Sequence, residues 1–469
     1  MAQIKFGTDG WRAVIAEDYT FDNVRKVSQA AADYVRSDGR ANQGVVVGYD
    51  TRFGSEHFAA AVAEVLAGNG IKTLLTNKFT PTPVVSYAII EKQAGAGIVI
   101  TASHNPPTDN GFKFKPYYGG SASPEIVDEL EKRLDQEIKR MPLEQAKAQG
   151  LVEYFDPSDS YIAQLEKIVD VEGLRNSNIK IAVDPMWGAG QGYYPRILGG
   201  GKVQVTQLHG ERNPIFPNMH NPEPIAKNLT DLINLMKSGE YNLGIANDGD
   251  ADRVGIVDET GRFLNQLEVY ALLALYMLEV RGERGPLVKS LSSTSMAEKL
   301  GQLYGVEVYE TPVGFKHIGP KMMETNAILG GEESGGFGFR GHIPERDGIL
   351  SGLIIADMMA KLKTNASGLL KYLFEKVGPH YYDRIDFKFD QSKRQEIMDR
   401  LATNPPKEIA GMPVVRSRTD DGFKYYTEDG SWLLIRFSGT EPIMRAYTEM
   451  SSPEKVQQVL QQGRSLTGV

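Results

Sequence analysis

The chain has 469 residues, a net charge of −8 and no cysteine. Because one domain usually holds about 100–150 residues, we expect three or four domains. The acidic balance argues against a nucleic-acid-binding protein, and the lack of cysteine excludes disulfides and thiolate nucleophiles or metal ligands. The N-terminal segment has no apolar core typical of a signal peptide, so we expect a cytoplasmic protein with no membrane partner. The oligomeric state is not indicated.

Apolar runs of strand length alternate with longer helical patterns along most of the chain. This alternation predicts α/β layers with parallel or mixed sheets. Stretch 267–280 is apolar, contains two glutamates and is too short to span a bilayer, so it is predicted to be a buried helix. Short strands dominate after about residue 378. The expected strands are 45–48, 97–100, 179–183, 243–246, 287–288 and 432–436, and the expected helices include 55–69 and 228–238.

Three segments share a pattern of an apolar strand, an aspartate and a Gly-containing loop. They are 45–55, 181–190 and 243–252, and they suggest repeated α/β units without establishing them. Two further segments, 133–160 and 377–385, have the character of connectors, the first of them charged and helical.

The first loop whose residues could take part in catalysis or binding is TASHNP (101–106), directly after the expected strand 97–100. Loops at the carboxyl end of strands form the functional edge of an open α/β sheet. Ser103, flanked by small residues, can present its hydroxyl to a ligand there. Taken alone, an ordinary Ser-Asn-Pro turn explains the same residues.

The second loop is DGDADR (248–253), also after a predicted strand. Asp248, Asp250 and Asp252 can converge on one cation, and an all-oxygen site suits Mg²⁺ or Ca²⁺. An EF-hand is excluded because its sixth position needs glycine and is Arg253, and because a strand rather than a helix precedes the loop. An acidic turn in solvent is the remaining alternative, although three close carboxylates repel one another without a cation.

Two later loops suit a sugar phosphate. In GGEESGG (330–336), glycines allow close approach of a ligand, and Glu332 and Ser334 offer partners for vicinal hydroxyls. In RFSGTEP (436–442), followed by Arg445, one guanidinium, two hydroxyls and backbone N–H groups can hold a phosphate. A flexible loop and a β-turn are the plainer alternatives.

TASHNP, DGDADR, GEESGG and RFSGTEP, in this order and spacing, resemble the α-D-phosphohexomutase superfamily over essentially the whole chain. The resemblance implies a heart-shaped protein with three similar α/β domains and a smaller C-terminal α+β domain around one cleft. We expect the domains to span 1–155, 156–257, 258–377 and 378–469.

The resemblance also implies roles for individual residues. Ser103 matches the phosphoserine, and its phosphate joins the three aspartates in holding Mg²⁺. Glu332 and Ser334 match the readers of the sugar 3- and 4-hydroxyls. Arg12, Lys113 and Arg253 match cations around the transferring phosphate. The residues expected to bind the substrate are Lys316, Arg436, Ser438, Gly439, Thr440 and Arg445.

A mutase of this kind passes the phosphoryl group from Ser103 to a hexose monophosphate, and the hexose 1,6-bisphosphate returns its other phosphate to the serine. The proton acceptor is Lys113, if burial and nearby cations lower its pKa, or His104. TPVGFK (311–316) and Gly336, where mannose- and glucosamine-type mutases usually have histidine, favour glucose phosphates, with glucose 1,6-bisphosphate as intermediate. The alternatives are mannose or glucosamine phosphates, a bisphosphate synthase on the same scaffold, a phosphatase, and a catalytically silent sugar-phosphate sensor.

Overall fold

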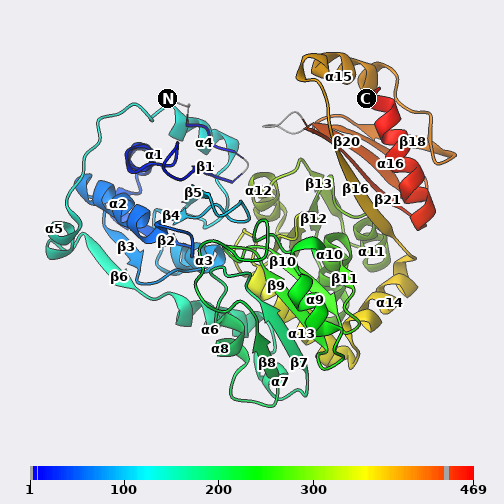
Figure 1. Cartoon of the computed structure of the whole chain (residues 1–469), viewed down its shortest axis with the longest axis horizontal. Helices are drawn as coiled ribbons and strands as arrows, with labels where there is room; N and C mark the ends of the chain where they lie inside the picture. The colour runs from blue at the N-terminus through cyan, green and yellow to red at the C-terminus, as the bar shows by residue number, and fades with distance from the viewer. Residues whose placement is uncertain (1–3, 8, 438–442, 469) are drawn as a thin grey trace.

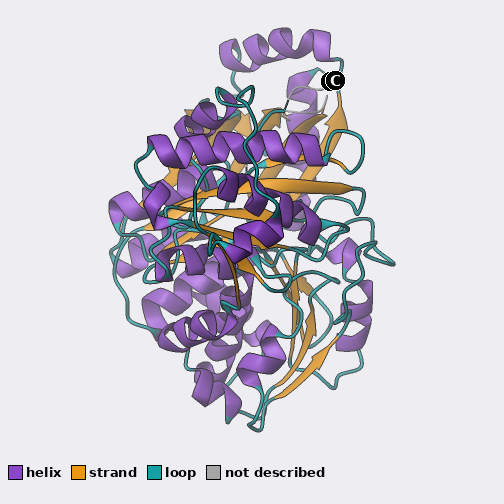
Figure 2. Cartoon of the chain, turned by 90° about the vertical axis from the view of Figure 1, so that its left-hand side faces the viewer, coloured by secondary structure: helices purple, strands orange, loops and turns teal. Residues whose placement is uncertain are grey.

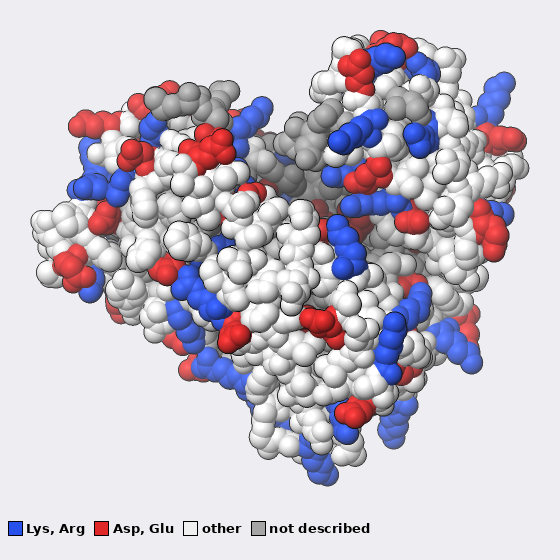
Figure 3. All heavy atoms as spheres, viewed as in Figure 1, with Lys and Arg blue, Asp and Glu red and all other residues white. Residues whose placement is uncertain are grey.

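The computed structural model describes residues 4–7, 9–437 and 443–468. Four sheets with their helices follow one another around a heart-shaped outline, from the N-terminal domain at the left of Figure 1 to the C-terminal domain at the upper right. The space-filling view in Figure 3 shows a deep notch between these two domains. Within the described residues, every helix is too short or too polar to cross a membrane.

The first domain has a six-stranded sheet in the order β1-β5-β4-β2-β3-β6. Helices lie on both sides of the sheets, as Figure 2 shows. Its elements are β1 (Trp11–Val14), α1 (Phe21–Ser37), β2 (Val45–Tyr49), α2 (Ser55–Gly68), β3 (Thr73–Thr76), α3 (Thr82–Glu91), β4 (Ala96–Ile100), β5 (Asp109–Pro116), α4 (Pro124–Glu131), α5 (Leu143–Ala148) and β6 (Val152–Phe155).

The second domain has the sheet β11-β10-β9-β7-β8. Its central parallel strands are buried along their whole length or nearly so, which explains why they appear in the sequence as continuous apolar runs. Its elements are α6 (Ser158–Ile168), α7 (Val171–Arg175), β7 (Lys180–Asp184), α8 (Tyr193–Leu198), β8 (Gln204–Gln207), α9 (Thr230–Met236), β9 (Leu243–Asn247), β10 (Val254–Asp258) and β11 (Phe263–Leu264).

The third domain begins with the buried helix predicted at 267–280. A capping box of Asn265 and Glu268 fixes its start, and it ends in a π-helical turn, η3 (Tyr276–Val280). The sheet order is β13-β12-β14-β15. The capped helix is α10 (Gln266–Leu275). The other elements are β12 (Leu287–Ser290), α11 (Met296–Tyr304), β13 (Val308–Thr311), α12 (Phe315–Thr325), β14 (Leu329–Gly331), β15 (Phe337–Phe339), α13 (Gly348–Leu362) and α14 (Ala366–Val377).

The three α/β sheets repeat one arrangement, β5-β4-β2-β3, β10-β9-β7-β8 and β15-β14-β12-β13. In each, a parallel strand turns into an antiparallel neighbour, and the loops at those turns are 101–108, 248–253 and 332–336. The serine, aspartate and glutamate loops are thus equivalent positions of three repeated units. The predicted repetition of α/β units is confirmed. Segments 45–55 and 181–190 contain the equivalent strands β2 and β7, whereas 243–252 contains β9, which is equivalent to β4.

The fourth domain is an antiparallel sheet in the order β16-β21-β20-β19-β18-β17, covered by α15 and α16. The change to short strands that was predicted near residue 378 coincides with the end of α14 at Val377. Its elements are β16 (Tyr381–Lys388), α15 (Arg394–Thr403), β17 (Glu408–Ile409), β18 (Met412–Arg418), β19 (Phe423–Thr427), β20 (Trp432–Phe437), β21 (Ile443–Met450) and α16 (Pro453–Thr467).

Two sequence predictions about connections need correction. Segment 133–160 is not a helical connector, because β6 within it pairs in parallel with β3 and extends the first sheet. The break expected after residue 257 would cut through β10, which runs to Asp258 and pairs with β11. Because strand pairing holds these residues in one sheet, we propose that the second domain extends through Leu264.

Candidate active site

Ser103 lies in the loop between β4 and β5 and is almost fully buried. Its hydroxyl donates a hydrogen bond of 2.8 Å to Asp248 Oδ2, and its backbone N–H donates one of 2.8 Å to Thr101 Oγ1. The Ser103 backbone has φ 53°, a left-handed conformation that is costly for residues other than glycine and concentrates at functional sites. The structure therefore brings the predicted serine loop and the predicted metal loop together.

Arg52, which was not predicted from the sequence, binds the backbone of the Ser103 loop. Its guanidinium donates to the carbonyl oxygens of Ser103 and Asn105, at 2.6 Å each, and to that of Pro106 at 2.7 Å. Arg52 is fully buried, and Asp50 forms an ion pair with it at 3.2 Å. The only sequence signal was its place in the repeated segment 45–55. Burial lowers the pKa of Arg52, but the guanidinium remains charged in this setting.

Asp248, Asp250 and Asp252 converge as predicted, each offering a carboxylate oxygen within 4.8 Å of the others. All three are buried, and Oδ1 of Asp250 and of Asp252 has no hydrogen-bond partner among the described residues. Burial and the two neighbouring carboxylates raise the pKa of Asp248 well above its usual range. Unpartnered buried carboxylate oxygens that repel one another are the donor set of a hard divalent cation, so these residues fit Mg²⁺. The strand β9 before the loop agrees with the exclusion of an EF-hand.

Lys113 projects from β5 into the same cluster. Its ammonium lies 2.8 Å from carboxylate oxygens of Asp9 and Asp250, and 3.0 Å from one of Asp252. Burial alone would lower the pKa of Lys113, but these carboxylates outweigh it and the pKa is raised. The expectation of a lowered pKa was therefore wrong, because the sequence did not reveal that three carboxylates face this lysine.

His104 lies beside Ser103, with Nδ1 3.4 Å from the serine Oγ. Burial and the nearby guanidinium groups of Arg253 and Arg12 lower the pKa of His104 well below its usual value. Arg12 in turn donates a hydrogen bond of 2.7 Å to Asn105 Oδ1 in the serine loop. The imidazole is consequently neutral near pH 7.

Glu332 and Ser334 lie in the loop between β14 and β15. Glu332 is buried, and this burial raises its pKa to about 7, although Arg346 and Arg253 oppose the shift. Ser334 Oγ lies 3.5 Å from Glu332 Oε2, so the two side chains face the same space. Lys316, predicted to contact the substrate, is half-buried in the first turn of α12.

Arg436 and Arg445 are directly opposite each other on β20 and β21 of the fourth domain. Arg436 pairs with both oxygens of Asp421, at 2.9 and 3.1 Å, and Arg445 lies 3.3 Å from Asp386 Oδ2. The two arginines lie on the strands just before and just after the loop of this hairpin, which is the predicted phosphate loop. Ser438, Gly439 and Thr440 lie outside the described residues.

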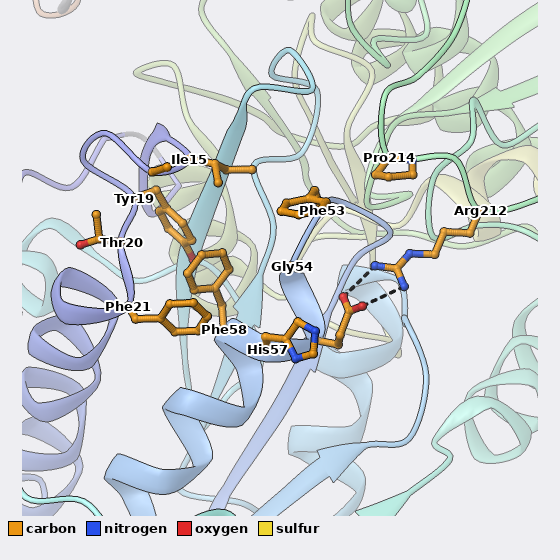
Figure 4. Close-up of a pocket in the computed structure, with 12 residues that line it drawn as sticks. Ile15, Tyr19, Thr20, Phe21, Phe53, Gly54, His57, Phe58, Arg212 and Pro214 are labelled. Atoms are coloured by element: carbon orange, nitrogen blue, oxygen red, sulfur yellow. Dashed lines mark hydrogen bonds and ion pairs between the residues drawn. The ribbon is translucent and has the colours of Figure 1, made fainter.

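A pocket of about 720 Å³ lies apart from these residues, lined mainly by Tyr19, Phe21, Phe53 and Phe58 (Figure 4). At its edge Arg212 forms an ion pair of 2.7 Å with Glu56, drawn with dashed lines in Figure 4. The same guanidinium donates to the backbone carbonyl oxygens of residues 51 and 52, at 3.1 and 3.2 Å. This contact ties the second domain to the segment that carries Arg52. None of the predicted site residues that the structure describes lines the pocket.

Comparison with known proteins agrees with this architecture. The chain matches the family models of phosphoglucomutase/phosphomannomutase domain I over residues 3–141, domain II over 159–261, domain III over 266–377 and the C-terminal domain over 395–464.

Individual relatives match over nearly their whole length. A phosphoglucomutase/phosphomannomutase of Thermococcus kodakarensis is 32% identical over 98% of both chains. A provisionally named phosphoglucosamine mutase of Pyrococcus abyssi is 32% identical over 98% of this chain and 97% of its own. The crystal structure of a provisionally named phosphomannomutase from Thermus thermophilus superposes with a TM-score of 0.86, at 35% identity and over 100% of both chains. With four domain matches and these full-length similarities, the chain belongs to the phosphoglucomutase/phosphomannomutase family of the α-D-phosphohexomutase superfamily.

Proposed function

We propose that this protein interconverts glucose 1-phosphate and glucose 6-phosphate through a phosphorylated Ser103 and a glucose 1,6-bisphosphate intermediate. The observation that supports this best is the 2.8 Å hydrogen bond from the Ser103 hydroxyl to Asp248, within a buried cluster of three carboxylates. A serine oxygen at a hard-cation site is the arrangement that phosphoryl transfer to and from serine requires.

In the forward half-reaction, a sugar hydroxyl oxygen attacks the phosphorus on Ser103. The new sugar O–P bond forms as the serine O–P bond breaks, and the sugar hydroxyl proton passes to a base. Mg²⁺, held by Asp248, Asp250 and Asp252, would supply positive charge beside the serine oxygen and the transferring phosphoryl group. The bisphosphate then reverses its orientation in the site and transfers its other phosphoryl group to Ser103.

Of the two candidate bases, we propose His104. It lies 3.4 Å from the serine oxygen, and its lowered pKa keeps it neutral. Lys113 is held protonated by its carboxylate neighbours. A protonated lysine has no lone pair for the sugar hydroxyl proton, so we assign Lys113, with Arg12 and Arg253, to stabilising negative charge around the phosphoryl group.

The non-reacting phosphate is proposed to bind at the end of the hairpin formed by β20 and β21. Arg436 and Arg445 supply two guanidinium groups there, and each is balanced by a carboxylate, Asp421 or Asp386, in the structure. One such cradle serves both orientations of the bisphosphate. Arg436→Ala is therefore expected to weaken binding of glucose 1-phosphate and glucose 6-phosphate alike, by about 2–4 kcal/mol.

The choice of glucose rests on the sequence features TPVGFK and Gly336, while the relatives carry names for glucose, mannose and glucosamine phosphates. The test is to measure turnover of the 1-phosphates of these three sugars with trace glucose 1,6-bisphosphate, with and without Mg²⁺. We expect glucose 1-phosphate to give the highest kcat/KM. Preference for another hexose would change the substrate only, accumulation of the bisphosphate would indicate a synthase, and no turnover of any hexose phosphate would refute the proposal.

A further inference from the structure

We propose that Arg346 is a positioning residue that joins the loops of three domains at this site, and that residue 336 is glycine to leave room for it. This inference rests on the proposed function, because its catalytic consequence runs through the carboxylate of Glu332. Arg346 lies outside the sequence motifs, and Gly336 entered the sequence analysis only as a marker of substrate preference.

The guanidinium of Arg346 is buried between the N-terminal segment, the metal loop and the sugar loop. It lies 2.9 Å from Asp252 Oδ2 of the metal loop, and it also pairs with Asp9 of the N-terminal segment. Its NH1 lies 3.6 Å from Glu332 Oε2 of the sugar loop, and its Nε lies 3.2 Å from Glu345. One side chain thus contacts acidic groups from the first, second and third domains. A planar guanidinium with five donors is suited to this, whereas an ammonium group is not.

Gly336 lies directly beneath this side chain. A Cβ built on Gly336 would stand 2.2 Å from Arg346 Cδ and 2.6 Å from its Cγ, far inside van der Waals contact. Positive φ values are found at Gly335 but not at Gly336, so the backbone conformation does not demand glycine at 336. The requirement is for space, and the group that uses the space is Arg346.

The arrangement fixes the position of Glu332. The ring of Phe315, from the TPVGFK segment, has its centroid 5.7 Å from the guanidinium carbon of Arg346, a cation–π distance. Arg346 thus contacts both the TPVGFK segment and the sugar loop, and its charge lies near the Glu332 carboxylate. Without it, the Glu332 carboxylate loses a nearby cation and is free to move away from the sugar hydroxyl that it is proposed to read.

The test is a double-mutant cycle with Arg346→Ala, Gly336→Ala and the double variant, each assayed for kcat/KM with glucose 1-phosphate and galactose 1-phosphate and for thermal unfolding. Loss of a residue that orients a functional group typically costs about 10–100-fold. We expect Arg346→Ala to lower kcat/KM for glucose 1-phosphate by roughly that factor and to reduce discrimination against galactose 1-phosphate. Gly336→Ala should do the same alone, yet change kcat/KM less than about twofold when Arg346 is already alanine.

Two further variants separate this role from general destabilisation. Arg346→Lys, which keeps the charge without the planar fork, should recover only part of the loss. Arg340→Ala removes an arginine of the same segment, paired at 2.8 Å with Glu283 and away from the site, and should leave kcat/KM and the discrimination unchanged.

Equal effects of Gly336→Ala in both backgrounds, or unchanged sugar discrimination in Arg346→Ala, would overturn the inference. If the wild-type protein turns over no hexose phosphate, the proposed function fails instead. The unfolding cycle still tests the packing of residue 336 against Arg346, since Gly336→Ala should lower the melting temperature only when Arg346 is present. If the alanine variant at 346 does not fold, the cycle is run with Arg346→Ser.

Discussion

The hydroxyl of Ser103 and the carboxylate of Asp248 are 145 positions apart in the chain and 2.8 Å apart in the structure. Each lies where a parallel strand of its own domain turns into an antiparallel neighbour. Because the first two domains share one sheet arrangement, the serine loop and the metal loop are equivalent loops, and they face each other across the boundary between these domains. This hydrogen bond is the observation that favours both the proposed phosphoserine and the proposed metal site.

The approach of these two loops depends on Gly249. A Cβ at this position would lie 2.4 Å from the carbonyl oxygen of Ser103, a contact that no rotamer change can relieve. We expect Gly249→Ala to push the loops apart and to lower kcat by at least about tenfold, since small displacements of reacting groups are costly. Steady-state kinetics alongside thermal unfolding measures this, and full activity with an unchanged melting temperature would show that the loops tolerate separation.

Replacing Asp250 with asparagine tests the metal site. Burial would raise the pKa of Asp250, but Lys113 and other neighbours hold it below its usual range, so the carboxylate is ionised. Asparagine keeps a carbonyl oxygen but loses the negative charge, so it is a weaker ligand at the proposed hard-cation site. Calorimetric titration should show Mg²⁺ binding weakened at least about tenfold, and most activity should be lost. An unchanged titration would mean that DGDADR is only a turn.

Glu332 predicts a dependence of stability on pH. Its folded pKa, raised to about 7 by burial, exceeds the ordinary glutamate value of 4.5. The folded protein therefore binds more protons than the unfolded chain between these values, and this residue lowers the free energy of unfolding as pH rises through that window. The full cost, about 3 kcal/mol, is reached above pH 7.

Glu332→Gln should accordingly raise the melting temperature at pH 8 and change it little at pH 4.5, while lowering activity. The measurement is thermal unfolding of both proteins across this pH range. A variant less stable than the wild type at pH 8 would show that the ionised Glu332 carboxylate contributes to stability rather than opposing it.

The pairing of Glu332 with Ser334 also predicts substrate choice. Glucose and mannose present the 3- and 4-hydroxyls identically, whereas galactose inverts the 4-hydroxyl. A buried hydrogen-bonding group left unpaired costs about 1–3 kcal/mol, so galactose 1-phosphate should be about ten- to a hundredfold poorer. Comparison of kcat/KM for the 1-phosphates measures this, and equal values for galactose and glucose would refute the role of these two residues.

Much of the fold followed from local patterns in the sequence. The buried parallel strands appear as apolar runs, and the helix after Asn265 has a capping box. Strand β6 was missed because it is short, with a half-exposed, charged sequence, and pairing with β3 alone gives it strand structure. Its edge position leaves no apolar run to detect.

The residues proposed to react could be selected from the sequence because each lies in a compact motif after a strand. Arg52 and Arg346 could not, because their roles depend on contacts with residues far away in the chain. The pKa of Lys113 was mispredicted for the same reason. The pKa is shifted upwards by Asp9, Asp250 and Asp252, and the sequence does not show that these three carboxylates surround one ammonium group.

The central claim is that Ser103 carries the phosphoryl group that is transferred. The most direct measurement is intact-mass and peptide analysis of the protein after incubation with glucose 1,6-bisphosphate and Mg²⁺, followed by addition of excess glucose 6-phosphate. We expect one phosphoryl group on Ser103, none on Ser103→Ala, and transfer of the group to the sugar when glucose 6-phosphate is added. A Ser103→Ala protein that retains full turnover of glucose 1-phosphate, or a phosphoryl group on another residue that transfers to the sugar, would contradict the account.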